Sequence, residues 1–251
     1  MFLTESARYA IRNSLNICVL TGAGVSAESG VATFRGEEGL WSKFKPQELA
    51  NFQAFMRNPE LVSEWYQYRR NIISNVEPNP GHFALAEWEK LHNTFTLVTQ
   101  NVDGLHQRAG SHRVIELHGN IWRNRCLKCG NSSDAAEVYI KDKVPLCPCG
   151  GMLRPDVVWF GEMLPPDAIE KAFVAAEAAD LFLLVGTSAV VHPAASLPEI
   201  AQSRGAFLIE INIERTALTD LAGLFLEGPS GQILPELLAQ WKAERTTQDK
   251  K

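Results

Sequence analysis

The chain has 251 residues, which at roughly 150 residues per domain predicts one large domain and a smaller one. Hydrophobic residues make up 45 % of the sequence and charged residues 21 %, as in folded globular proteins, so a disordered, collagen-like or coiled-coil chain is excluded. The formal net charge is -5 and the sequence contains no cluster of Lys and Arg, so we expect no nucleic-acid partner.

No apolar segment has the length typical of a membrane span. The longest wholly apolar run inside a predicted element covers residues 181–185, whereas a helix needs about 20 apolar residues to cross a bilayer. Residues 1–13 contain no apolar stretch of signal-peptide length. We therefore expect no membrane partner and a cytoplasmic location.

Apolar runs of strand length recur at residues 16–20, 95–99, 181–185 and 206–211. Residues 166–179 are rich in alanine with proline near the start, and residues 193–203 lie between the last two runs, so both segments are predicted helices. Strands that are apolar along their whole length and alternate with helices indicate a parallel sheet buried on both faces. The pattern predicts a doubly wound α/β fold.

Two segments do not fit this alternation and are assigned to a smaller domain. Residues 36–76 are helix-rich and aromatic, with a helix predicted at 59–73, and residues 121–156 contain four of the five cysteines. The predicted large domain consists of residues 1–35, 77–120 and 157–245, and the small domain of residues 36–76 and 121–156.

A glycine-rich turn directly follows the first predicted strand. Residues 22–27 satisfy the pattern glycine-x-glycine-x-x-glycine or alanine, which lets a backbone approach a pyrophosphate at a helix N-terminus. The alternative is a small-residue turn that only serves tight packing of strand and helix. A dehydrogenase would also need an acidic residue after a second strand about 20 residues later, but residues 39–55 are predicted as helix and loop. Hydride transfer is therefore disfavoured.

Polar residues follow several other predicted strands. The carboxyl ends of parallel strands meet at one edge of the sheet, where ligands bind, so these residues are candidates for a cofactor site, with an ordinary polar loop as the alternative. His118 ends a further alternating run at 114–117 and is either an acid or base near neutral pH or a structural hydrogen bonder. The other candidates are Gln100, Asn101, Asp103, Gly186, Thr187, Ser188, Asn212 and Glu214.

The four clustered cysteines form two pairs, Cys126-x-x-Cys129 and Cys147-x-Cys149, separated by 17 intervening residues. Pairs of thiolates at this spacing predict one tetrahedral zinc site. The second pair is one residue shorter than usual, so free thiols or a degenerate site are the alternatives. Four thiolates leave no open coordination position, so the predicted zinc is structural. Cys18 stands apart and is predicted to lie in the core.

Several motifs together resemble the sirtuins, NAD-dependent protein-lysine deacylases, over about residues 10–240. The resemblance implies a Rossmann-type large domain, a small domain with a zinc module, and a cleft between them for acyl-lysine of other proteins. It also implies that NAD is consumed: nicotinamide leaves and the acyl group ends on ADP-ribose. The motifs are residues 22–36, 99–110, 117–119, 153–162, 186–188 and 211–214, with the two cysteine pairs.

The resemblance also implies roles for individual residues. His118 is the expected catalytic base, Asn101 orients the ribose and a water, and Asp103 contacts the nicotinamide carboxamide. Gln100 holds the ribose, Phe34 covers the reacting carbon, and Arg35 meets the phosphates. Val158, Trp159 and Phe160 are expected to pair as a strand with the substrate backbone. The remaining expected cofactor contacts are Gly22, Ala23, Gly24, Ser26, Gly186, Thr187, Ser188, Asn212, Glu214 and Ser230.

The acyl preference is predicted from Tyr66 and Arg69. In the helix expected at 59–73, a phenol and a guanidinium three residues apart share one face and can bind one carboxylate; the alternative is that both are solvated. Together with Ala50, which matches a widened acyl pocket, Tyr66-x-x-Arg69 matches the bacterial and mitochondrial branch of the family that removes succinyl and malonyl groups. We therefore expect a desuccinylase and demalonylase that also deacetylates.

Two alternatives to a deacylase use the same cofactor site. A protein ADP-ribosyltransferase needs no acyl channel, and a non-catalytic NAD or ADP-ribose sensor does not require His118. Nicotinamide release measured with and without acylated peptide separates the three.

Overall fold

The computed structural model describes residues 3–33, 46–135 and 144–248. Its main feature is a parallel sheet of six strands in the order β3-β2-β1-β7-β8-β9. The chain starts in the middle of the sheet, builds outward in one direction, and then returns to the other side of β1. The strands are β1 (Ile17–Thr21), β2 (Phe95–Thr99), β3 (Val114–Glu116), β7 (Leu181–Val185), β8 (Phe207–Asn212) and β9 (Leu224–Glu227).

This architecture confirms the predicted doubly wound, Rossmann-type α/β fold. Every residue of β1 and β7 is buried, because helices cover both faces of the sheet, and this explains why these segments are apolar throughout. The first strand is displaced by one residue from the predicted run at 16–20.

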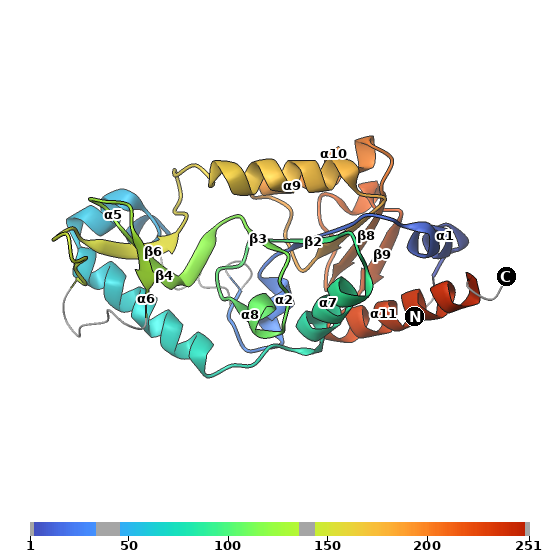
Figure 1. Ribbon diagram of the computed structural model, residues 1–251, viewed down its shortest axis with the longest axis horizontal. Coiled ribbons are helices and arrows are strands. Elements are labelled where there is room, and N and C mark those ends of the chain that lie inside the picture. The colour runs from blue at the N-terminus through green and yellow to red at the C-terminus, as the bar shows by residue number, and fades with distance from the viewer. Residues whose placement is uncertain (1–2, 34–45, 136–143, 249–251) are drawn as a thin grey trace.

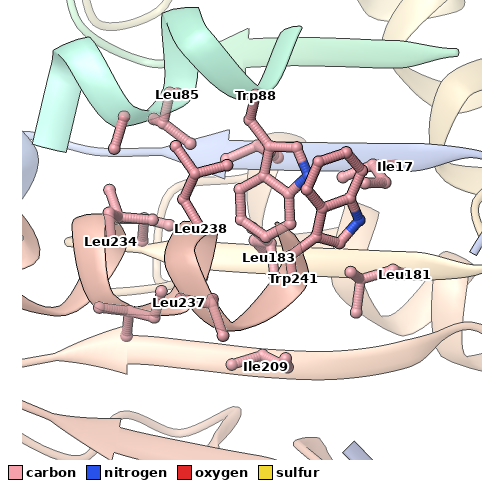
Figure 2. Close-up of a cluster of buried hydrophobic side chains, with 14 of the residues drawn as sticks. Ile17, Leu85, Trp88, Leu181, Leu183, Ile209, Leu234, Leu237, Leu238 and Trp241 are labelled. Carbon is pink, nitrogen blue, oxygen red and sulfur yellow. The ribbon is translucent and has the colours of Figure 1, made fainter. Parts of the chain in front are cut away.

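One face of the sheet is covered by α1 (Glu5–Asn13), α7 (Pro80–Leu91) and α11 (Ser230–Gln248). Leu85 and Trp88 of α7 and a set of apolar residues of α11 pack on the strands, as Figure 2 shows. The α11 residues are Leu234, Leu237, Leu238 and Trp241, and the strand residues beneath them include Ile17, Leu181, Leu183 and Ile209.

The opposite face is covered by α9 (Pro166–Ala178) and α10 (Leu197–Ser203), which lie across the sheet from α7 and α11 in Figure 1. Small residues of α9, Ala172 and Ala176, lie in the same buried cluster as Phe182 and Leu184 of β7. Cys18 lies in this core as predicted, and burial raises the pKa of its thiol to about 12.

The second part of the molecule lies at the end opposite the two termini (Figure 1). Within residues 46–135 and 144–157 it contains three helices, α4 to α6, and a three-stranded antiparallel sheet of order β5-β4-β6. Its core joins Phe55, Val62 and Trp65 from the helices to Ile121 and Val157 from the sheet. The elements are α4 (Pro46–Leu49), α5 (Phe52–Arg57), α6 (Pro59–Ser74), β4 (Gly119–Cys126), β5 (Ser132–Asp134) and β6 (Leu153–Val157).

Arg70 of α6 connects the helical and β parts of this region. Its Nε donates to the carbonyl oxygen of Ile121 at 2.6 Å and its Nη2 to Asn124 Oδ1 at 2.8 Å. The boundaries predicted at 120/121 and 156/157 fall inside β4 and β6, so these two strands run continuously through the predicted boundary points. The division into two domains at those residues stays a prediction.

Two short helices, α2 (Gly24–Ala27) and α8 (Leu105–Arg108), follow β1 and β2 directly. Among the helices of the described ranges, none is long and apolar enough to cross a membrane.

Candidate active site

The order of the sheet strands reverses between β1 and β7, and the loops that leave the carboxyl ends of these strands touch each other. Gly22 N–H donates to Val185 O at 3.0 Å, and Gly24 N–H donates to Gly186 O at 2.7 Å. A Cβ at Gly24 would lie 2.7 Å from Gly186 O, and Gly186 itself has φ +56. The glycines therefore serve tight packing between the two loops, and ligands of such sheets bind at this switch point.

A cavity of about 800 Å³ opens at this point, a size suited to a small-molecule ligand. It brings together most of the residues predicted for the cofactor, the base and the acyl group. They come from the carboxyl ends of β1, β2, β3, β7 and β8, from the start of α11 and from the second part of the molecule. These are Gly22, Ala23, Gly24, Ala50, Tyr66, Arg69, Gln100, Asn101, His118, Val158, Trp159, Phe160, Gly186, Thr187, Ser188, Asn212, Glu214 and Ser230.

Four predicted residues are not in this lining. Ser26 and Asp103 are buried directly behind Asn101. Phe34 and Arg35 lie outside the described residues.

Ser26, Asn101 and Asp103 form a buried hydrogen-bonded group. Ser26 Oγ donates to Asp103 Oδ2 at 2.8 Å and accepts from Asn101 Nδ2 at 3.1 Å. The other oxygen of Asp103 accepts from the N–H of Leu105 at 2.9 Å. Burial raises the pKa of Asp103, while the bonds from Leu105 and Ser26 oppose this shift by stabilising the carboxylate.

Two buried histidines that sequence reasoning missed lie behind this group. His82 Nδ1 accepts the N–H of Asn79 at 3.3 Å, so its proton is on Nε2, which faces Ser26 Oγ at 3.4 Å. Burial lowers the pKa of His82 to about 4, so it is neutral. His106 stacks against it with ring centroids 4.8 Å apart.

His106 is connected to the end of β2 through two threonines. Its Nε2 lies 3.0 Å from Thr21 Oγ1, which donates to Thr99 Oγ1 at 2.9 Å. Thr99 Oγ1 also accepts the N–H of Asn101 at 3.0 Å, so this chain fixes the backbone of Asn101. The sequence feature that could have identified His106 as a site residue is its position within the motif at 99–110.

His118 follows β3 and lines the cavity. Its Nδ1 lies 2.9 Å from the carbonyl oxygen of Gln100, and because a carbonyl only accepts, Nδ1 carries the proton and Nε2 has a free electron pair. Burial lowers the pKa of His118, so the ring is neutral near pH 7. The side chain is thus in the form that a general base needs.

Thr187, which follows β7, connects the carboxyl ends of β2 and β8. Its hydroxyl accepts from Gln100 Nε2 at 2.9 Å, and its carbonyl oxygen accepts from Asn212 Nδ2 at 2.9 Å. Glu28, another residue missed from sequence, accepts the N–H of Gly231 at 2.6 Å and so ties α2 to the start of α11. These bonds fix the loops that form the wall of the cavity.

Tyr66 and Arg69 both point from α6 into buried surroundings. Tyr66 is 2 % and Arg69 6 % exposed, so the alternative that they are solvated is wrong. Burial raises the pKa of Tyr66 and lowers that of Arg69, whose positive charge is supported by Tyr66 and Asp103. The Arg69 guanidinium carbon lies 5.3 Å from the centre of the Trp65 ring.

Val158, Trp159 and Phe160 lie just beyond the end of β6. Their N–H groups all donate within the chain: Val158 to His118 O at 2.9 Å, Trp159 to Glu162 Oε2 at 2.8 Å, and Phe160 to Ala50 O at 3.0 Å. Strand pairing with a substrate stays a prediction, and in this arrangement it would have to use the carbonyl oxygens of the segment.

The four clustered cysteines converge as a metal site requires. Their Sγ atoms all lie within 4.8 Å of one another, with Cys126 and Cys149 3.5 Å and Cys129 and Cys147 3.7 Å apart. Zinc bound tetrahedrally at about 2.3 Å from each sulfur would separate the sulfurs by roughly 3.8 Å. N–H groups of Cys129 and Lys128 lower the pKa of the Cys126 thiol to about 6. The residues fit a structural zinc.

Comparisons with known proteins agree with this geometry. The family model described as "Sir2 family" matches residues 22–193. The chain is 52 % identical to "NAD-dependent protein deacylase 2" of Pyrobaculum aerophilum over 94 % of this chain and 95 % of that protein. A solved structure described as a Sir2 homolog-NAD complex has a TM-score of 0.90 and 48 % identity, covering 96 % and 95 % of the two chains.

A further solved structure, described as "Sir2-p53 peptide-NAD+", has a TM-score of 0.86 and 32 % identity and covers 96 % of this chain and 100 % of that chain. The fold and site define an enzyme of the sirtuin class. The chain belongs to the Sir2 family, so the resemblance predicted from its motifs is confirmed.

Proposed function

We propose that the protein is an NAD-dependent protein-lysine deacylase that removes succinyl and malonyl groups, and also acetyl groups, from lysines of other proteins in the cytoplasm. The observation that carries the proposal is the neutral His118, with Nε2 unprotonated, in the same cavity as the buried pair Tyr66 and Arg69. Relatives named NAD-dependent protein deacylase and neighbours solved with NAD and with a peptide support it.

NAD, when bound, supplies a ribose from which nicotinamide leaves and which then takes the acyl group. In this proposal Nε2 of His118 removes a proton from a ribose hydroxyl, and the carbonyl oxygen of Gln100 stabilises the imidazolium that forms. Asn101 orients the ribose and Asp103 the carboxamide. The hydroxyl of Ser26 bonds to both side chains and so fixes their positions relative to each other. Phe34 and Arg35 are proposed to complete the cofactor site.

The acyl group is proposed to enter beside Ala50, with its terminal carboxylate against Tyr66 and Arg69. A carboxylate taken out of water needs charged or hydrogen-bonding partners, and a guanidinium with a phenol provides both. Their position supports this role, because both side chains are buried and line the same cavity as His118. The zinc bound by Cys126, Cys129, Cys147 and Cys149 is proposed to stabilise the small domain only.

The test is incubation with NAD and the same peptide carrying succinyl-, malonyl-, acetyl- or unmodified lysine, with products read by mass. The proposal expects acyl loss matched by nicotinamide release. An ADP-ribosyltransferase would release nicotinamide with the unmodified peptide, and a sensor would release none.

A further inference from the structure

The indole of Trp159 makes a hydrogen bond that the roles proposed above do not use. Its Nε1–H donates to the hydroxyl oxygen of Tyr66 at 2.7 Å, and both side chains are 2 % exposed. A phenol oxygen that accepts from an indole has one proton of its own, which it must donate in another direction. Trp159 therefore restricts the direction in which Tyr66 acts as a donor.

The Trp159 ring cannot easily turn away from Tyr66, because it is held on several sides. The guanidinium carbon of Arg154 lies 3.5 Å from the ring centre, and the ring of Phe55 lies 5.4 Å away, centre to centre. The backbone N–H of Trp159 donates to Glu162 Oε2, and the same carboxylate pairs with the buried Arg154. An ion pair between the buried Arg154 and the half-buried Glu162 thus stands directly behind the indole.

Trp159, Tyr66 and Arg69 line the same cavity as His118. An acyl carboxylate that binds among them gives up hydrogen bonds to water and accepts hydrogen bonds from the protein. Binding costs less conformational entropy when the protein donor is already oriented than when it must be ordered. An acetyl group presents no carboxylate to Tyr66.

We propose that Trp159 is a positioning residue for acidic acyl groups, because its indole N–H holds the Tyr66 hydroxyl so that its proton is presented to the acyl carboxylate. The inference rests on the acidic-acyl preference proposed above. It adds that the preference depends on a residue of the 158–160 segment as well as on α6.

The test is the ratio of kcat/KM for succinyl-lysine to kcat/KM for acetyl-lysine in one peptide. Trp159→Phe deletes the N–H and keeps an aromatic ring between Arg154 and Phe55. Because a neutral hydrogen bond contributes about 0.5 to 1.5 kcal/mol, the ratio should fall about 2- to 13-fold, mainly through the KM for succinyl-lysine. In a Tyr66→Phe background, Trp159→Phe should change the ratio no further. Trp88→Phe, in the core beneath α11, is the matched control and should leave the ratio unchanged.

A structural role for Trp159 predicts something else: equal losses on both acyl groups, or additive effects of the two substitutions. Either result overturns the inference while the preference of the wild type stands. A wild type with no preference for succinyl would instead overturn the proposed specificity and the inference with it.

If Trp159→Phe misfolds, benzothienylalanine at position 159 keeps the ring volume and replaces N–H by sulfur. The indole proton resonance of Trp159 should also move in Tyr66→Phe, and a stationary resonance would contradict the bond.

Discussion

His118 Nδ1 lies 2.9 Å from the carbonyl oxygen of Gln100, so the residue after β2 fixes which ring nitrogen carries the proton in a side chain that follows β3. The carbonyl can only accept, and the proton of the neutral ring is therefore held on the side away from the free electron pair. Because β2 and β3 are adjacent in the sheet, the geometry of the base depends on strand pairing.

The activity should depend on pH through His118. Burial lowers the pKa of His118 below its ordinary value of 6.5, and the base works in its neutral form, so protonation inactivates it. The acid limb of the kcat/KM profile should therefore be centred below pH 6.5, because this profile reports the pKa of the free enzyme. An acid limb centred at or above pH 6.5 would contradict the assignment.

Removal of the base should affect chemistry far more than binding. General-base catalysis contributes about 10²- to 10⁴-fold, so His118→Ala should lose at least that much deacylation while NAD binding, measured by calorimetry, largely survives. His112→Ala, an exposed histidine, serves as the control and should retain activity. Turnover by His118→Ala close to the wild type would remove His118 from the mechanism.

The cysteine cluster predicts one zinc per chain by elemental analysis. Structural zinc contributes folding free energy, so chelation or Cys147→Ser should lower the melting temperature, and activity should fall only as the small domain loses order. Cys18→Ala, which lies outside the cluster, should keep its zinc. An active, zinc-free protein whose stability is insensitive to chelation would show that the site is degenerate.

Arg69 should determine the preference for acidic acyl groups. Hydrogen bonds to charged groups are worth about 1.5 to 3 kcal/mol, so Arg69→Met should lower kcat/KM for succinyl-lysine roughly 10- to 150-fold relative to acetyl-lysine. Arg70→Met is a matched control, because Arg70 bonds to Ile121 and Asn124 and should affect both substrates equally. Equal losses for Arg69→Met would make its role structural.

The parallel sheet was predictable because strands buried on both faces are continuously apolar, as at residues 95–99 and 181–185. The antiparallel strands β4 and β6 were not predicted. They carry charged and polar residues such as Arg123, Arg125 and Arg154, so their apolar periodicity is weak. Asp156, which pairs with both Arg123 and Arg125, is distant from them in sequence.

At the site, residues that follow strands could be identified because the topology places strand ends together, as for Asn101 and His118. His82 and the pair Arg154 and Glu162 could not be identified in this way, because the local sequence does not show whether a histidine or an arginine is buried. His82 contacts Ser26, which is 56 residues away in the sequence. Arg154 is buried only in the folded chain.

The most direct test of the account is to count products. Enzyme, NAD and a succinyl-lysine peptide are incubated, and nicotinamide, free lysine peptide and succinylated ADP-ribose are quantified by mass over time. A deacylase that transfers the acyl group to ADP-ribose forms equal amounts of all three and releases no nicotinamide when the lysine is unmodified. Nicotinamide release without acyl loss, or free succinate and unchanged NAD, would contradict this assignment.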